Sequence, residues 1–173
     1  MDHSENTLRA VEKALTDVVA PAVDPKDALA AEQLRLVVDF VRFLRGRLEW
    51  LDARARFECA RHLATARALR VFGPLVAPDV RAALEAATEQ AEALPADADQ
   101  RRVGAATAAL AGAIRRLVRA AQDIAPDARS RIERATLEGA EPIIAFERAW
   151  YLPQGFDAAP SDVPPLESFL RPT

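Results

Sequence analysis

The sequence has little cysteine and histidine and none of the common catalytic motifs. Its 173 residues include one cysteine and two histidines. A single cysteine excludes a disulfide within the chain and a zinc site built from several cysteines. No Gly-rich phosphate loop, Gly-x-Ser-x-Gly elbow, His-Glu-x-x-His pair or EF-hand loop is present. These absences exclude the usual short motifs for nucleotide, acyl-transfer, zinc and calcium chemistry, and we expect no cofactor and no metal.

Two further absences bear on location and partners. The chain has no run of 18 apolar residues, and its first residues have neither the positive nor the apolar region of a signal peptide. The net charge of −3 is small and of mixed sign along the chain, which disfavours nucleic acid as a partner. We therefore expect a cytoplasmic protein with no membrane span and no nucleic-acid ligand.

Alanine is the most abundant residue of the chain. The chain contains 38 alanines, the strongest helix former, whereas β-branched and aromatic residues are scattered singly or in pairs. A length of 173 residues suits one ordinary domain. The sequence predicts an all-α fold, a bundle of about five helices over residues 1–152, followed by an extended Pro-rich tail over residues 153–173.

The first two predicted helices are separated by a proline. Ser4 is expected to cap the first, which ends at Pro21, and Asp24 with Pro25 is expected to open a long second segment. Unbroken to residue 72, that segment would measure about 70 Å, so we expect either a bend near Gly46 or an elongated molecule.

Apolar side chains recur along the long segment at helical spacing. One predicted seam is Leu34, Val37, Val41, Leu44, Leu48, Leu51 and Ala55, and a neighbouring line continues it with Cys59, Leu63, Ala66 and Leu69. The bulky residues Phe40, Phe43, Trp50, Phe57 and Phe72 cannot all face that seam. A second buried face is therefore expected, either within the bundle or against another subunit.

Three more helices are predicted after Pro74. One begins at Pro78, the next is capped by Asp97 or Asp99, and the last begins at Pro126 and is kinked or divided at Pro142. The middle helix has the most regular seam: Val103, Thr107, Leu110, Ile114, Leu117, Ala121 and Ile124. Its small residues Gly104, Ala108 and Gly112 predict a close approach by another backbone.

The predicted tail combines prolines with apolar side chains. Its prolines disfavour a regular helix, yet it also contains Phe156, Val163, Leu166, Phe169 and Leu170. So many apolar groups are expected to dock, with the chain's own bundle or a second copy of it favoured over another partner.

Glu58 and His62 are the weak candidates for a catalytic pair. They are four residues apart and so share one helical face, where they would form an acid–base pair or two metal ligands. Two ligands do not make a metal site, and the Glu-x-x-His spacing of di-iron bundles does not occur in the chain. Cys59 lies on the apolar line, as a buried structural thiol would.

Arginines recur every seven residues at Arg47, Arg54 and Arg61. On one continuous helix this spacing places them on one side, where they would bind an anion or an acidic partner surface. The alternative is a solvated face whose arginines pair locally, as Asp52 and Arg56 would.

Residues 8–70 contain three characteristic segments: 19–23 (VAPAV), 31–38 (AEQLRLVV) and 60–64 (ARHLA). These segments resemble small bacterial helical proteins encoded beside aminoglycoside-phosphotransferase-like kinases and acyl-CoA dehydrogenases. The resemblance implies a small non-catalytic subunit that works with a hydroxyacyl-CoA kinase, and it carries over no functional residue.

Together these features favour a non-catalytic accessory or interaction subunit, with a protein partner or self-association. One alternative is a small enzyme or ligand-binding bundle centred on Glu58 and His62, with Arg54 or Arg61 holding an anion. Another is a phasin-like protein that coats a hydrophobic granule.

Overall fold

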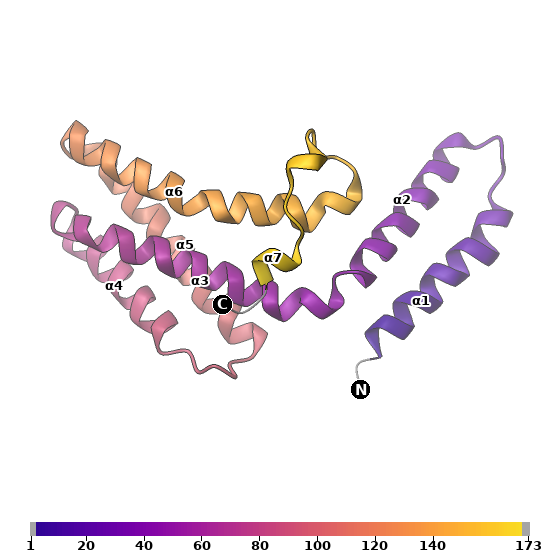
Figure 1. Ribbon diagram of the computed structural model, residues 1–173, viewed down its shortest axis with the longest axis horizontal. Helices are drawn as coiled ribbons and strands as arrows, with labels where there is room; N and C mark the ends of the chain where they lie inside the picture. Colours follow the sequence, from indigo (N-terminus) through magenta and orange to yellow (C-terminus); the bar gives the residue numbers. More distant parts are fainter. Residues whose placement is uncertain (1–2, 171–173) are drawn as a thin grey trace. The chain divides into compact units, whose positions relative to one another are not determined.

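The computed structural model describes residues 3–170, which form seven α-helices joined by short helical turns and loops and contain no strand (Figure 1). The all-α expectation is confirmed, whereas the number of helices exceeds the five expected. One additional helix arises because the long second segment is divided, and the other because the tail contains a helical turn. Within the described residues, no helix combines the length and the apolar composition needed to cross a bilayer.

The chain forms two compact units, which are described separately. The hairpin unit comprises Met1–Leu51 with Tyr151–Ala158, and the bundle unit comprises Asp52–Trp150 with Ala159–Thr173. This division differs from the expected domain over residues 1–152 and tail over 153–173. In the long helical segment the boundary falls between Leu51 and Asp52, directly after the 3-10 turn at Leu48–Trp50.

The hairpin unit is built from two neighbouring helices, α1 (Ser4–Ala14) and α2 (Ala28–Arg45) (Figure 1). A π-helical turn, Leu15–Val19, extends α1. The predicted caps are displaced: Ser4 is the first helical residue rather than the cap, and Asp27 instead of Asp24 caps α2 by accepting from the Ala30 N–H. Asp24 accepts the N–H of Lys26 instead, so the Asp-Pro pair forms a turn before the helix.

The long helical segment is broken at the glycine that the sequence indicated. Gly46 ends α2, a 3-10 turn follows at Leu48–Trp50, and α3 spans Leu51–Leu69. On α2 the buried residues are Val38 and Val41, whereas Val37 of the predicted seam is 48% exposed. The seam was wrong at that position because the buried line continues from Leu34 to Val38, four residues on, and not to Val37, three residues on.

The bundle unit contains α3 and four more helices: α4 (Pro78–Glu92), α5 (Gln100–Ala120), α6 (Pro126–Tyr151) and α7 (Glu167–Leu170). Asp99 caps α5 by accepting from the Arg102 N–H. The core is formed by the predicted apolar lines of α3 and α5 together with Leu84, Ala87 and Ala91 of α4 and Ile132 of α6. Side chains such as Leu110 and Leu117 have no exposed surface, which confirms the seam predicted for α5.

Of the two outcomes predicted at Pro142, the division is excluded, and the close approach predicted at Gly104 and Gly112 is corrected. The helix α6 continues through Pro142 and is not divided, and the carbonyl that loses its amide partner belongs to the exposed residue Glu138, where water can replace the bond. Gly104 and Gly112 have no neighbour within 4 Å of a Cβ placed on them. The close approach occurs at Gly139, where an added Cβ would lie 2.8 Å from Thr65 Cγ2 and nearer still to its Oγ1.

The Pro-rich segment is turned and helical rather than extended. It contains 3-10 turns at Leu152–Gln154 and Pro160–Asp162 before α7, and residues 171–173 of the predicted tail lie outside the described part of the chain. Within the bundle unit, the Phe169 ring meets the rings of Phe57 and Phe146 edge-on, at centroid distances of 6.0 and 5.9 Å. Leu166 is also buried. Docking on the chain's own bundle is therefore confirmed for this part, but not for Phe156, which is 83% exposed.

Candidate interaction site

Glu58 and His62 lie one turn apart on α3, yet no hydrogen bond joins them within the described residues. The Glu58 carboxylate instead accepts a hydrogen bond of 2.7 Å from Arg54 Nε. The sequence correctly predicted that Glu58 and His62 share one face of a helix. It did not predict that Arg54 binds the Glu58 carboxylate.

Arg54 bridges two carboxylates from different helices. Its Nη2 donates to Glu147 Oε1 of α6 at 2.8 Å, and its guanidinium carbon lies 4.5 Å from the centroid of the Trp150 ring. Burial raises the pKa of Glu147, the positive charge of Arg54 opposes that rise, and the nearby Glu58 carboxylate adds to it. The bridge holds α3 against α6. Glu147 and Trp150 were missed because they are far from Arg54 in sequence.

The His62 imidazole is half-buried, and burial is the main cause that lowers its pKa. The positive charge of Arg115 lowers this pKa further, whereas the Glu58 carboxylate acts in the opposite direction. The neutral ring is therefore favoured. Among the described residues, no group of three His, Cys, Asp or Glu side chains is arranged to hold a metal ion.

The three arginines spaced by seven do not form one surface on one helix. Arg47 belongs to the hairpin unit, where its guanidinium carbon lies 5.6 Å from the centroid of the Phe43 ring. Arg54 and Arg61 belong to α3 of the bundle unit, and Arg61 stands 5.4 Å from the centroid of Phe57. The spacing argument required a continuous helix, and the 3-10 turn at Leu48–Trp50 separates Arg47 from Arg54.

The helix α2 carries apolar side chains on two opposite faces. Residues two apart on an α-helix are separated by about 200°, so they point in nearly opposite directions. Leu34, Val38 and Val41 form the inner face, of which Val38 and Val41 are buried. Two residues beyond each of these lie Leu36, Phe40 and Phe43, and Leu29 shares their side of the helix. We call Leu29, Leu36, Phe40 and Phe43 the α2 outer face.

Most of the α2 outer face is exposed in the hairpin unit. The exposed fractions are 71% for Leu29, 41% for Leu36 and 53% for Phe40. Phe43 is the most covered of the four, because its ring stacks on Tyr151 at a centroid distance of 5.6 Å and on Phe40 at 6.4 Å. The sequence correctly indicated that the aromatic residues need a second face, and the structure leaves much of that face without a cover inside the unit.

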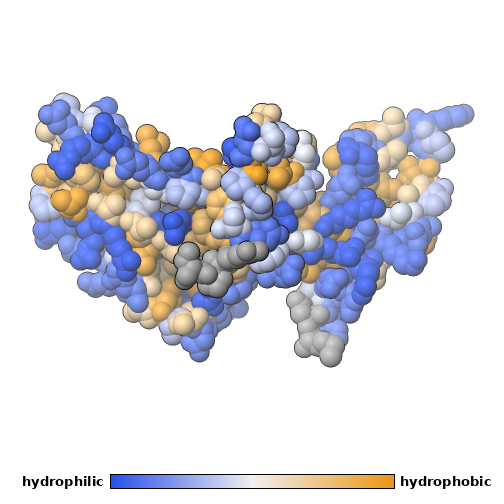
Figure 2. Space-filling model, in the orientation of Figure 1, coloured by the Kyte–Doolittle hydropathy of each residue, from blue (hydrophilic) through white to orange (hydrophobic). Residues whose placement is uncertain are grey.

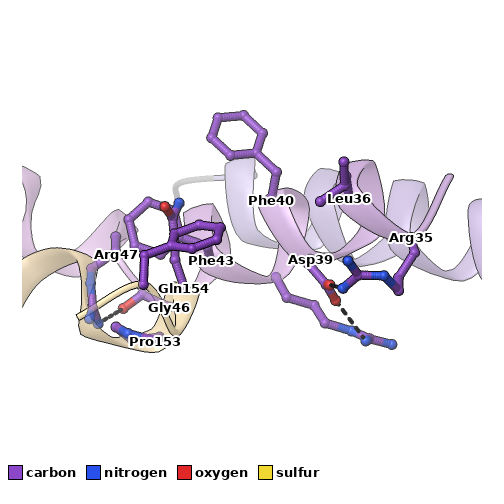
Figure 3. A pocket seen from close by; sticks show the side chains of 11 residues that line it. Arg35, Leu36, Asp39, Phe40, Phe43, Gly46, Arg47, Pro153 and Gln154 are labelled. Carbon is purple, nitrogen blue, oxygen red and sulfur yellow. Dashed lines mark hydrogen bonds and ion pairs between the residues drawn. The ribbon is translucent and has the colours of Figure 1, made fainter. Parts of the chain in front are cut away.

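A groove of about 610 Å³ runs beside this face, between α2 and the segment that contains Pro153, Gln154 and Phe156. Figure 3 shows Phe40 and Leu36 projecting from α2 away from the ion pair between Arg35 and Asp39. In the space-filling view, the hairpin unit presents mostly hydrophilic side chains to the reader, and apolar side chains emerge beside them (Figure 2). The groove thus combines an apolar wall with a charged rim.

The charges along the rim are mainly arginines. Arg35 contacts Glu32 at 2.7 Å and Asp39 at 2.9 Å, and Arg42 contacts Glu12 of α1 at 2.8 Å. The side chains of the two Arg35 pairs are about half exposed, so these pairs contribute little to stability. Their geometry instead holds the guanidinium groups along one edge of the groove.

Comparison of the chain with protein-family models, with curated proteins and with solved structures finds no match in any of the three. The features available for assigning a function are therefore those of the fold: an all-helical chain whose hairpin unit has an uncovered apolar helix face.

Proposed function

We propose that the protein is a non-catalytic interaction subunit that binds a partner protein through the α2 outer face. One observation carries the proposal: α2 is apolar on two opposite faces, and the hairpin unit covers only one of them. A helix that is apolar on both sides is the expected middle layer of a larger helical assembly.

The spacing of the exposed residues supports a binding surface. Isolated apolar side chains on a surface are ordinary, but Leu29, Leu36 and Phe40 follow one another along a single helix face. Burying a leucine or phenylalanine side chain contributes about 1.5–3 kcal/mol, so covering this row would supply substantial binding free energy. Partners that bind helices commonly read side chains at this spacing.

The arrangement around Glu58 and His62 gives less support to an enzyme. Glu58 is engaged by Arg54, and neither Glu58 nor His62 lines the groove beside α2. The Arg54 bridge between α3 and α6 has a clear structural role, since it connects two helices of the bundle unit.

The resemblance of residues 8–70 to small bacterial helical proteins encoded beside aminoglycoside-phosphotransferase-like kinases and acyl-CoA dehydrogenases suggests one class of partner. We accordingly propose a kinase-like or acyl-CoA-processing catabolic enzyme as the first partner to test. We propose that this enzyme binds the α2 outer face.

The proposal is tested by expressing tagged protein in its native host and isolating any stoichiometric complex. The affinity of that complex is then measured with purified components. Leu29→Glu is expected to weaken that complex at least tenfold. Leu137→Glu is the matched control, because Leu137 on α6 of the bundle unit is also 71% exposed. Equal affinity for the two variants, with unchanged helical circular dichroism, would show that the α2 outer face is not the binding surface.

A further inference from the structure

The helix α1 contributes little apolar surface to the hairpin unit. Over Ser4–Ala14, the described span of α1, no residue is buried, and Val11 is 41% exposed. Along residues 4–19 the partly buried side chains are those of Leu8, Glu12 and Leu15, which are spaced by four and three residues and so share one side of the helix. A carboxylate therefore lies at the middle of the stripe that α1 turns toward α2, where purely apolar packing would require another aliphatic side chain.

The Glu12 carboxylate is bound by two arginines of α2. Its Oε1 accepts a hydrogen bond of 2.8 Å from Arg42 Nε, and its Oε2 accepts one from Arg45 Nη1. The hydrogen bonds from Arg42 and Arg45 hold the pKa of Glu12 below its ordinary value of 4.5, so the carboxylate is ionised at neutral pH. The contact between α1 and α2 thus has an ionic centre, whose strength depends on the salt concentration.

The space between α2 and the segment that follows α1 is not tightly filled. A pocket of about 380 Å³ is lined on one side by Thr16, Ala20 and Val23 and on the other by Leu34 and Val38 of α2. Apolar side chains beside such a space make fewer dispersion contacts than those in a filled core. The apolar contacts that hold the hairpin closed are therefore few.

A helix held by few buried apolar contacts opens at a lower free energy than a helix of the core. From the weak apolar packing and the ionic centre we infer that α1 is a detachable cover for the inner face of α2, held in place by the Glu12 carboxylate. Its release exposes Val38 and Val41, so that α2 then offers apolar surface on both sides. The inference concerns the inner face of α2 and does not depend on the proposed function, which uses the outer face.

Amide hydrogen exchange of the full-length protein, measured by mass spectrometry, tests the release. Peptides from residues 4–14, 28–45 and 100–120 report on α1, α2 and α5 respectively. We expect the protection factors of α1 to be at least tenfold lower than those of α2 and of α5. Raising the sodium chloride concentration is expected to lower them further, because salt screens the pairing of Glu12.

Two substitutions that each remove one carboxylate separate the contact at Glu12 from a general loss of charge. Glu12→Gln is expected to lower the protection factors of α1 at least tenfold and to abolish their salt dependence, with α5 unchanged. Asp17→Asn is the matched control, because Asp17 pairs at 2.8 Å with Lys13 of α1 itself, and we expect it to change α1 by less than twofold. Adding Arg45→Gln to Glu12→Gln is expected to have little further effect, since both substitutions remove the same contact.

A thiol probe reports directly on the inner face of α2. Val38→Cys introduces a thiol at a residue that is 8% exposed, and Cys59 in the core of the bundle unit, which is 7% exposed, is the internal reference. We expect iodoacetamide to modify the introduced thiol at least tenfold faster than Cys59, and faster again by at least tenfold when Glu12→Gln is also present. Helical circular dichroism of each variant verifies that it folds.

Protection of α1 equal to that of α5, or equal effects of Glu12→Gln and Asp17→Asn, would overturn the inference. Joint loss of protection in α1 and α2 would also overturn it, because the hairpin would then open as a whole and α1 would not be a separate cover. None of these outcomes bears on the outer face, so the proposed function is still decided by the effect of Leu29→Glu on the native complex.

Discussion

The hairpin unit and the bundle unit are both helical, yet they differ in how much apolar surface they bury. Val38 and Val41 are the buried apolar residues among the described part of the hairpin unit, whereas every other buried apolar side chain in the described residues belongs to the bundle unit. The difference shows that helix-forming sequence alone does not produce a core. Tertiary packing, which supplies most of the stability of protein helices, is concentrated in the bundle unit.

The number of helices that meet in each unit explains this difference. In the bundle unit the apolar lines of α3, α4, α5 and α6 converge on common residues. In the hairpin unit α1 can cover only one side of α2, so the other side depends on a short segment or on another molecule. A unit of this size seldom holds a large core by itself.

Alanine substitutions at one buried residue of each unit test the comparison most strongly. Leu110→Ala is expected to lower the free energy of unfolding of the bundle unit by about 2–5 kcal/mol, because Leu110 has no exposed surface. Val41→Ala is expected to cost roughly 1–2 kcal/mol, since it removes less apolar volume. Urea denaturation followed by amide hydrogen exchange measures the two effects unit by unit. A larger loss in Val41→Ala would reverse the comparison.

Substitutions of two phenylalanines compare a docked part of the Pro-rich segment with an exposed part. Phe169→Ala is expected to destabilise the bundle unit by about 2 kcal/mol, because the half-buried ring contacts Phe57 and Phe146. Phe156→Ala is expected to change the stability by less than about 0.5 kcal/mol, since its side chain is 83% exposed. Thermal unfolding of both variants measures the difference. Equal destabilisation would mean that Phe156 is also docked in the isolated protein.

Two glycines test how closely helices approach within the bundle unit. Gly139→Ala is expected to cost about 1–3 kcal/mol, because the new methyl group would collide with Thr65. Gly104→Ala has open space and is expected to stabilise the protein by about 0.5–1 kcal/mol. Urea denaturation measures both changes, and Thr65→Ala is expected to relieve part of the Gly139→Ala penalty. Stabilisation by Gly139→Ala would show that α3 and α6 are not in close contact there.

The sequence predicted the local features of the fold better than the contacts between distant segments. The break at Gly46, the cap at Asp99 and the seam through Leu110 and Leu117 all depend on neighbouring residues, and the structure confirms them. The close approach was expected at Gly104 but occurs at Gly139, because it depends on which helix lies opposite. The spacing of residues along a helix shows which side of the helix is apolar, but it does not show which other helix packs against that side.

The candidate sites show the same limit. Periodicity placed Glu58 and His62 on one face and indicated a second face for the aromatic residues. It could not identify Glu147 as the second carboxylate at Arg54, because 93 residues separate them. Nor could it show that Phe57 meets Phe146 while Phe40 remains exposed, since both are aromatic residues of the same long segment.

The smallest expected effect is the titration of His62 inside the bundle unit. Burial lowers its pKa below the ordinary value of 6.5, so the unfolded chain binds the proton more tightly than the folded one. Its contribution to stability is therefore fully present above pH 6.5 and is lost as the pH falls through the lower folded-state pKa. Proton NMR of the imidazole measures the midpoint directly.

Variants that remove nearby charges identify the causes of the His62 pKa shift. Glu58→Gln is expected to lower the His62 pKa further, because it removes a negative charge that favours the protonated ring, and Arg115→Gln is expected to raise it. His62→Gln should reduce the loss of bundle stability on acidification below pH 6.5. The hairpin unit contains no counterpart to this half-buried imidazole among its described residues, so amide exchange in α2 should not respond to the substitution. A His62 midpoint above 6.5 would show that the Glu58 carboxylate, rather than burial, controls the ring.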